Sequence, residues 1–167
     1  MSYYQSQSDS YQQSDAGVPT LLATALGAFA YIVGLLLTVI TTEIGLPIGL
    51  EVSGSFEGYL IIQFWIHELS IITDGSFITD FVPLAVLMAM LLTGTGYLVA
   101  RANGGQKAVI SGAAISIGYF IIAALSLAFI AVRFEGLLIG QLLIGLIVTG
   151  VVYPVLFGGI GGALAKK

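Results

Sequence analysis

The sequence predicts an all-α membrane protein, a four-transmembrane-helix bundle. Two observations carry this prediction: the chain is 57% hydrophobic but only 8% charged, and its apolar residues form four long runs. Soluble domains carry about 25% charged residues, so this chain has too few to cover a globular surface. Apolar runs beyond about 18 residues are typical of helices that cross a bilayer.

The predicted organisation is a polar tail followed by one helical domain over residues 19–167. Residues 1–18 are rich in Ser, Gln and Tyr, which predicts disorder because such a composition buries little apolar area. A long acidic segment, 43–80, separates the first apolar run from the other three, which follow one another through short connections. The predicted spans are 20–42, 81–100, 108–132 and 137–164.

Prolines mark three positions in these helices. Pro19 is expected to start the first helix, and Pro83 is expected in the first turn of the second. Pro154 lies inside the fourth span, where it removes a backbone hydrogen bond and is expected to bend the helix.

Basic residues predict the orientation, with both termini in the cytoplasm and the protein in the cell membrane. In this arrangement Arg133 is the one basic residue outside, and four lie inside: Arg101, Lys107, Lys166 and Lys167. The inverted arrangement reverses these numbers, and short cytoplasmic loops normally carry the excess of Lys and Arg. The segment 43–80, which has acidic residues but no Lys or Arg, is then extracellular.

Residues 56–72 (FEGYLIIQFWIHELSII) complicate the number of spans, because they are apolar but include charged side chains. As a fifth span they would bury charge, so we expect an amphipathic segment on the outer interface or capping the bundle. A strand and a re-entrant segment are the alternatives. On a helical wheel one side gathers the polar residues Glu57, Gln63, His67, Glu68 and Ser70. The candidate external interaction residues are Trp65, His67 and Glu68.

The chain contains 22 glycines, and their spacing indicates where helices pack closely. Small residues allow close approach of helix backbones, which drives packing in lipid. Both packing within the chain and contact with a second copy or another membrane protein fit this pattern. The candidate packing residues are Gly27, Gly34, Gly112, Ser116, Gly136, Gly140, Gly158 and Gly162. A short echo between 26–29 (LGAF) and 117–120 (IGYF) fits either duplication or chance.

The predicted spans contain no Asp, Glu, Lys, Arg or His. Ion-coupled transport and proton relays usually need an ionisable group within the membrane. The chain has no cysteine and one histidine, so we expect neither a metal site nor a cofactor. It also lacks a nucleophile elbow and a P-loop, so we expect no enzyme, and its few basic residues form no nucleic-acid patch.

The chain resembles the small four-helix membrane proteins of halophilic archaea, a family without an established activity. The resemblance rests on the polar tail, on 27–34 (GAFAYIVG), on the aromatic 64–67 (FWIH) in an acidic loop, and on three further Gly/Ala-rich spans. It implies a high-salt environment and no functional residues. Some members carry a generic transporter label.

Two functions are compatible with the sequence. The first is a structural or accessory membrane protein that packs through Gly-rich helix faces and presents the acidic external loop. The second is a small oligomeric transporter or channel subunit for a neutral or small solute. A polar, water-accessible cavity lined by Thr38, Thr93, Ser116 or Gln141 would favour the second.

Overall fold

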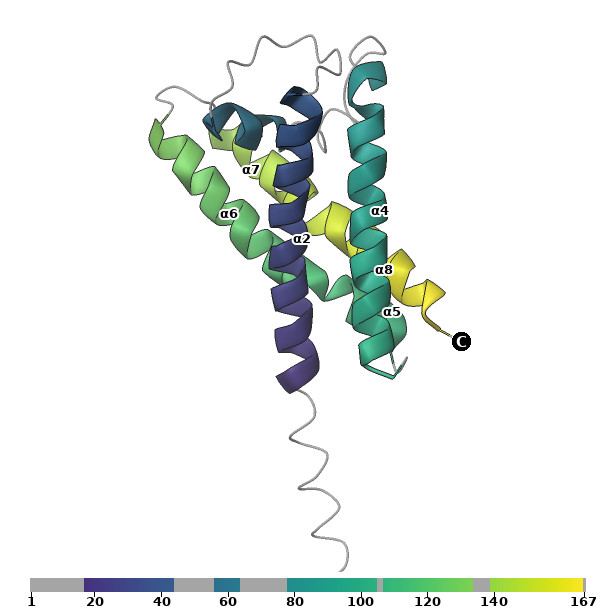
Figure 1. Ribbon diagram of the computed structural model, residues 1–167. Helices are drawn as coiled ribbons and strands as arrows, with labels where there is room; N and C mark the ends of the chain where they lie inside the picture. Colours follow the sequence, from purple (N-terminus) through teal and green to yellow (C-terminus); the bar gives the residue numbers. More distant parts are fainter. Residues whose placement is uncertain (1–16, 44–55, 64–77, 105–106, 134–138, 167) are drawn as a thin grey trace, which may run out of the picture.

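The computed structural model describes residues 17–43, 56–63, 78–104, 107–133 and 139–166. Within these ranges every regular element is a helix (Figure 1). The order is α2 (Gly17–Glu43), a short helix over 56–63, α4 (Ile78–Ala102), α5 (Ala108–Ala113), α6 (Ile115–Arg133), α7 (Ile139–Ile147), the π-helical turn η1 (Val148–Val152) and α8 (Tyr153–Leu164).

Four helical stretches are long and apolar enough to cross a membrane, as the sequence predicted. The first three agree with the predicted spans to within two residues, and the fourth ends where it was predicted to end. The stretches are Thr20–Glu43, Pro83–Ala102, Ala108–Val132 and Leu143–Leu164.

Two helices begin earlier than the sequence indicated. Helix α2 starts at Gly17, inside the segment 1–18 that was predicted to be a tail. Helix α4 starts at Ile78, so the prediction that Pro83 lies in its first turn is wrong.

The chain crosses the bundle four times in alternating directions, so the helix ends fall into two groups (Figure 1). Arg101, Lys107 and Lys166 are exposed at one end, here called the basic end. Glu43 and Glu57 lie at the opposite end, here called the acidic end, where the 56–63 helix crosses the bundle.

Two of the crossings are not straight helices. Ala114 is a turn between α5 and α6, so the third crossing bends there, a feature the sequence did not predict. The fourth contains η1, in which the Tyr153 N–H donates to the carbonyl of Val148, five residues earlier. Pro154 follows directly, so the irregularity expected at this proline takes the form of a π-helical turn.

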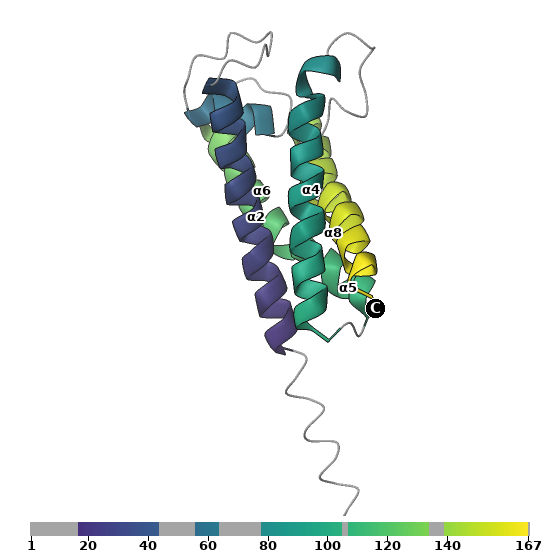
Figure 2. The ribbon, with the colours of Figure 1, turned by 45° about the vertical axis from the view of Figure 1, so that its right-hand side comes forward.

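Three glycines bring α4, α5 and α8 into backbone contact, and we call them the glycine crossing: Gly96, Gly112 and Gly158. A methyl group on Gly96 would lie 2.3 Å from the Gly158 carbonyl oxygen, and one on Gly112 would lie 2.2 Å from the same oxygen. Helix α8 therefore packs against both α4 and α5 at a distance that only glycine allows. Figure 2 shows the three helices from a second side.

A second close crossing joins α2 to α6. A methyl group on Gly27 would lie 1.9 Å from the carbonyl oxygen of Ile115, and one on Gly118 would lie 1.7 Å from that of Thr24. The two glycines of the sequence echo therefore lie at the same contact, each facing the backbone of the other helix.

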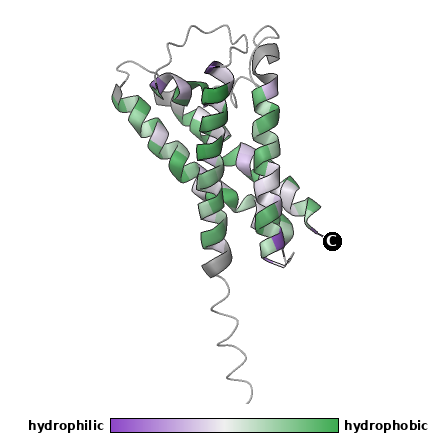
Figure 3. Ribbon diagram, viewed as in Figure 1, coloured by the Kyte–Doolittle hydropathy of each residue, from purple (hydrophilic) through white to green (hydrophobic). Residues whose placement is uncertain are grey.

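Most residues along the four crossings are hydrophobic and appear green in Figure 3, with paler residues in the lower part of α4. Met90, Leu125 and Val132, on α4 and α6, expose 65%, 63% and 81% of their surface. Large apolar surfaces of this kind are uncommon on soluble monomers and suit contact with lipid tails.

Candidate functional site

The 56–63 helix is seated in the acidic end of the bundle. Leu60 and Ile62 are 2% and 1% exposed, and Tyr59 is also buried. Phe56 is half exposed and contacts Phe129 of α6 edge to face, with ring centroids 6.0 Å apart. This described part of the segment therefore caps the bundle, one of the two placements expected for it.

Gln63, at the end of this helix, has no exposed surface. Its side-chain oxygen accepts a hydrogen bond from the hydroxyl of Thr38 on α2. Its amide nitrogen lies 3.5 Å from the hydroxyl of Tyr119 on α6. Gln63 shares one side of the helical wheel with Glu57, but it lies inside the bundle, where partners on two long helices satisfy its amide.

Gly34 makes room for this amide. A methyl group there would lie 2.9 Å from the Gln63 nitrogen and 2.8 Å from the Met88 sulfur. The single hydroxyl proton of Thr38 is shared between the Gln63 oxygen and the Gly34 carbonyl, which lies 3.0 Å from the hydroxyl oxygen, one helical turn earlier. The candidate packing residue Gly34 thus packs within the chain, under the cap.

Two tyrosine rings pack together next to Gln63. The rings of Tyr31 and Tyr119 meet edge to face, with centroids 5.0 Å apart, and both side chains are buried. The Tyr31 hydroxyl is enclosed and faces Ser126, without a hydrogen bond of good geometry. We call Tyr31, Thr38, Gln63 and Tyr119 the polar cluster.

A second polar contact ties the cap to α2. The hydroxyl of Tyr59 donates a hydrogen bond to the carboxylate of Glu43 at the end of α2. This bond to a carboxylate, aided by burial and by the negative charge, raises the pKa of Tyr59 above its ordinary value of 10.0. The cap is thus held at Tyr59 and again at Gln63.

The candidate external residues Trp65, His67 and Glu68 lie outside the described residues, as do Gly136 and the side-chain environment of Gly140 and Gln141. The structure places other candidate glycines inside the bundle. Gly162 faces the Ala108 carbonyl of α5, at 2.1 Å from an added methyl group, and Ser116 is partly buried. Over the parts of the chain that are described, no group of three His, Asp or Glu side chains could hold a metal ion.

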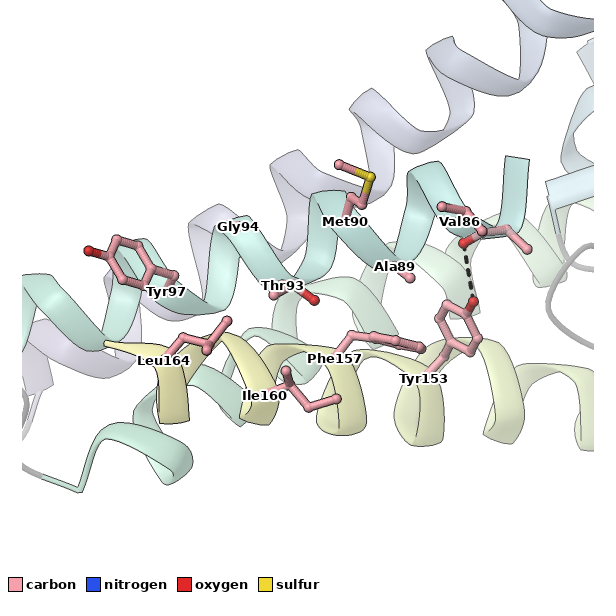
Figure 4. A pocket seen from close by; sticks show the side chains of 11 residues that line it. Val86, Ala89, Met90, Thr93, Gly94, Tyr97, Tyr153, Phe157, Ile160 and Leu164 are labelled. Carbon is pink, nitrogen blue, oxygen red and sulfur yellow. Dashed lines mark hydrogen bonds between the residues drawn. The ribbon is translucent and has the colours of Figure 1, made fainter. Parts of the chain in front are cut away.

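An apolar groove of about 710 Å³ runs along the surface between α4 and α8 (Figure 4). Its α4 wall has small side chains, among them Ala85, Ala89 and Thr93, and its α8 wall has large ones, among them Tyr153 and Phe157. Sequence reasoning missed this groove. The signal that could have found it is the four-residue spacing of the small residues on α4.

At its basic end the groove finishes at a polar group. Tyr97 lines the groove, and its hydroxyl accepts a hydrogen bond of 3.0 Å from the guanidinium of Arg101. The same guanidinium lies 6.0 Å from the centre of the Tyr97 ring. Tyr97 therefore holds Arg101 at the mouth of the groove.

The fold and these contacts define a helical protein with four segments long enough to cross a membrane, a seated cap at one end and an apolar groove on one side. The chain belongs to a family of unknown function (DUF7978), which matches residues 48–167. No curated protein and no solved structure matches it.

Proposed function

We propose that the chain is an integral membrane protein with four spans and both termini in the cytoplasm, and that its role is structural or accessory. The hydropathy and length of the four stretches support insertion. The exposed Arg101, Lys107 and Lys166 at one end support an orientation with that end in the cytoplasm. The acidic end with its cap then faces outward.

The observation that carries the accessory role is the burial of Gln63. A solute pathway through this end would need space where the polar cluster packs, and Thr38 and Gln63 instead satisfy each other with no exposed surface. Thr93, another candidate pathway residue, lines the apolar groove on the outside of the bundle. The packing of Thr38 and Gln63 supports a cap that offers a fixed surface to a membrane protein partner or a second copy.

Site-specific photo-crosslinking in intact cells tests this role. A photoreactive side chain at Glu57, partly exposed on the cap, should give one defined adduct whose mass identifies the partner. The same group at Ile110, exposed on α5 near the basic end, is the matched control and should give none. Monomer without any adduct at Glu57 would count against the accessory role.

A flux measurement addresses the transporter alternative directly. Proteoliposomes with the wild-type chain should take up glycerol no faster than protein-free vesicles. The Gln63→Ala variant removes the amide that fills the acidic end. Uptake by the wild type, increased further by Gln63→Ala, would replace the accessory role with transport.

A further inference from the structure

The groove between α4 and α8 is long enough to hold one extended hydrocarbon chain. The lining residues of α4 run from Ala85 to Tyr97, and the twelve helical rises between them correspond to about 18 Å. This length exceeds half of the bilayer's apolar core, which is about 30 Å thick. A groove of these dimensions reaches from one membrane interface past the midplane.

The two walls differ in a way that leaves a channel open along the surface. Ala85, Ala89 and Thr93 follow one another at four-residue spacing on α4 and leave space above its backbone. The rings of Tyr153 and Phe157, with centroids 4.6 Å apart, stand opposite on α8 (Figure 4). Met90 borders the groove and is 65% exposed, so this flexible side chain can adapt to an occupant.

The ends of the groove are unlike. Toward the acidic end the Tyr153 hydroxyl donates a hydrogen bond of 3.2 Å to the Ala85 carbonyl, which ties the two walls together. Toward the basic end the groove finishes at Tyr97 and Arg101. The groove therefore has one apolar closed end and one charged end.

Charge is also distributed asymmetrically around the groove. The guanidinium has five donors, so the bond from Arg101 to Tyr97 leaves most of them for another acceptor. Lys107 and Lys166 are exposed at the same end of the bundle. In the part of the chain that the structure describes, Glu43 and Glu57 lie at the other end. An anion is favoured at this mouth.

We propose that this groove binds one hydrocarbon chain of an anionic phospholipid of the cytoplasmic leaflet, with the lipid phosphate at Arg101. The proposal rests on the membrane insertion proposed above. A lipid has one long apolar chain and one anionic end, which matches a groove that is apolar along its length and basic at a single end. Basic sites beside transmembrane helices on the cytoplasmic side commonly bind anionic headgroups.

Lipid retention measured by native mass spectrometry tests the proposal. The full chain is reconstituted in vesicles of equal parts phosphatidylglycerol and phosphatidylcholine, then released in mild detergent. The wild type should retain phosphatidylglycerol preferentially. Arg101→Gln should weaken that preference about fivefold, the effect expected for one basic residue at an anionic surface, and Arg101→Lys should restore part of it.

A pair of groove variants separates specific binding from the general lipid coat. Ala89→Leu places a branched side chain in the groove and should abolish the retained phosphatidylglycerol. Ala128→Leu adds the same atoms at an exposed position on α6 and should leave retention unchanged. Equal retention in wild type and Ala89→Leu would overturn the proposal, as would equal loss in both variants.

Two further results distinguish the other failures. A dimer that Ala89→Leu dissociates, without bound lipid, would show that a second copy occupies the groove and would overturn the lipid site. Flotation with vesicles of phosphatidylcholine alone measures membrane insertion independently of any anionic lipid. A chain that floats but shows no phosphatidylglycerol preference contradicts only the lipid site, whereas a chain that does not float contradicts the insertion itself.

Discussion

A methyl group on Gly112 would lie 2.2 Å from the carbonyl oxygen of Gly158, so α5 and α8 touch backbone to backbone. The atoms nearest to this methyl group belong to the backbone of Gly158 and Gly162 and cannot rotate away as a flexible side chain would. The two helices must therefore separate to admit a larger residue. Gly112→Ala should therefore destabilise the bundle by about 1–3 kcal/mol, the usual range for overpacking. Thermal unfolding in mild detergent measures this loss.

Gly94 provides the matched control on α4. It lies two residues before Gly96 of the glycine crossing, is exposed, and has no atom within 4 Å of an added methyl group. Gly94→Ala should leave stability unchanged or raise it by up to about 1 kcal/mol, because alanine favours the helix. Equal losses for Gly94→Ala and Gly112→Ala would show that helix propensity, not the crossing, governs both.

The bond between Thr38 and Gln63 predicts a coupling between cap and bundle. Thr38→Val leaves the buried amide of Gln63 without its donor and should destabilise the fold by about 1–2 kcal/mol. In a double-mutant cycle with Gln63→Leu, the two losses should fall short of additivity. Unfolding in detergent, followed by circular dichroism, provides the four values.

Thr41 is the control for this cycle, one turn further along α2. Its hydroxyl bonds to the carbonyls of Leu37 and Thr38 within its own helix. Thr41→Val should lower stability little and should be additive with Gln63→Leu. Additivity for Thr38→Val as well would mean that the cap is not held by this bond.

The Tyr59 contact predicts a dependence of stability on high pH. Since the folded state raises the pKa of Tyr59 above 10.0, the bond to Glu43 contributes fully below that pH and is lost as the pH rises through the raised value. Tyr59→Phe should be less stable than wild type near neutral pH, and the difference should shrink in alkali. A difference that grows with pH would contradict this sign.

The proposed orientation predicts which single cysteines an impermeant thiol reagent can reach in intact cells. The chain has no cysteine of its own, so each introduced thiol is the only one. Cysteine at Ser53 should react, and cysteine at Ala102, exposed at the basic end, should react only after lysis. Ala102 is preferable to Gly104, whose φ of +67° disfavours any other residue. Reaction at Ala102 in intact cells would reverse the orientation.

Hydropathy predicted the four spans because each is a continuous apolar run, and all their limits except the start of the fourth lie within two residues of the predicted ones. Hydropathy could not predict how the 56–63 helix packs into the bundle. Gln63 shares a helical side with Glu57 and His67, and periodicity cannot reveal that Thr38 and Tyr119 lie inside the bundle and satisfy it. Sequence patterns report the solvent preference of a residue, whereas its burial depends on partners distant in the chain.

The same limit applies to the glycines and the bends. Spacing singled out Gly112, Gly158 and Gly162, whereas Gly96, which has Ala100 four residues later, was not singled out and emerges only as the third member of the crossing. The turn at Ala114 has no proline or glycine of its own to mark it.

A resemblance to proteins of halophilic archaea stays a prediction from the sequence.

The π-helical turn before Pro154 sets the rotational phase of the final helix. A π-helical turn holds one residue more than an α-helical turn, so η1 takes up an extra residue while the helix on either side stays regular. Closing η1 to a regular α-helix with the same number of residues would turn everything after it by about 100° and carry Gly158 and Gly162 away from α5. Deleting Val151 would instead remove the extra residue and keep these glycines in phase. The contact of α8 with α5 therefore depends on the agreement between the shape of this turn and the number of residues in it.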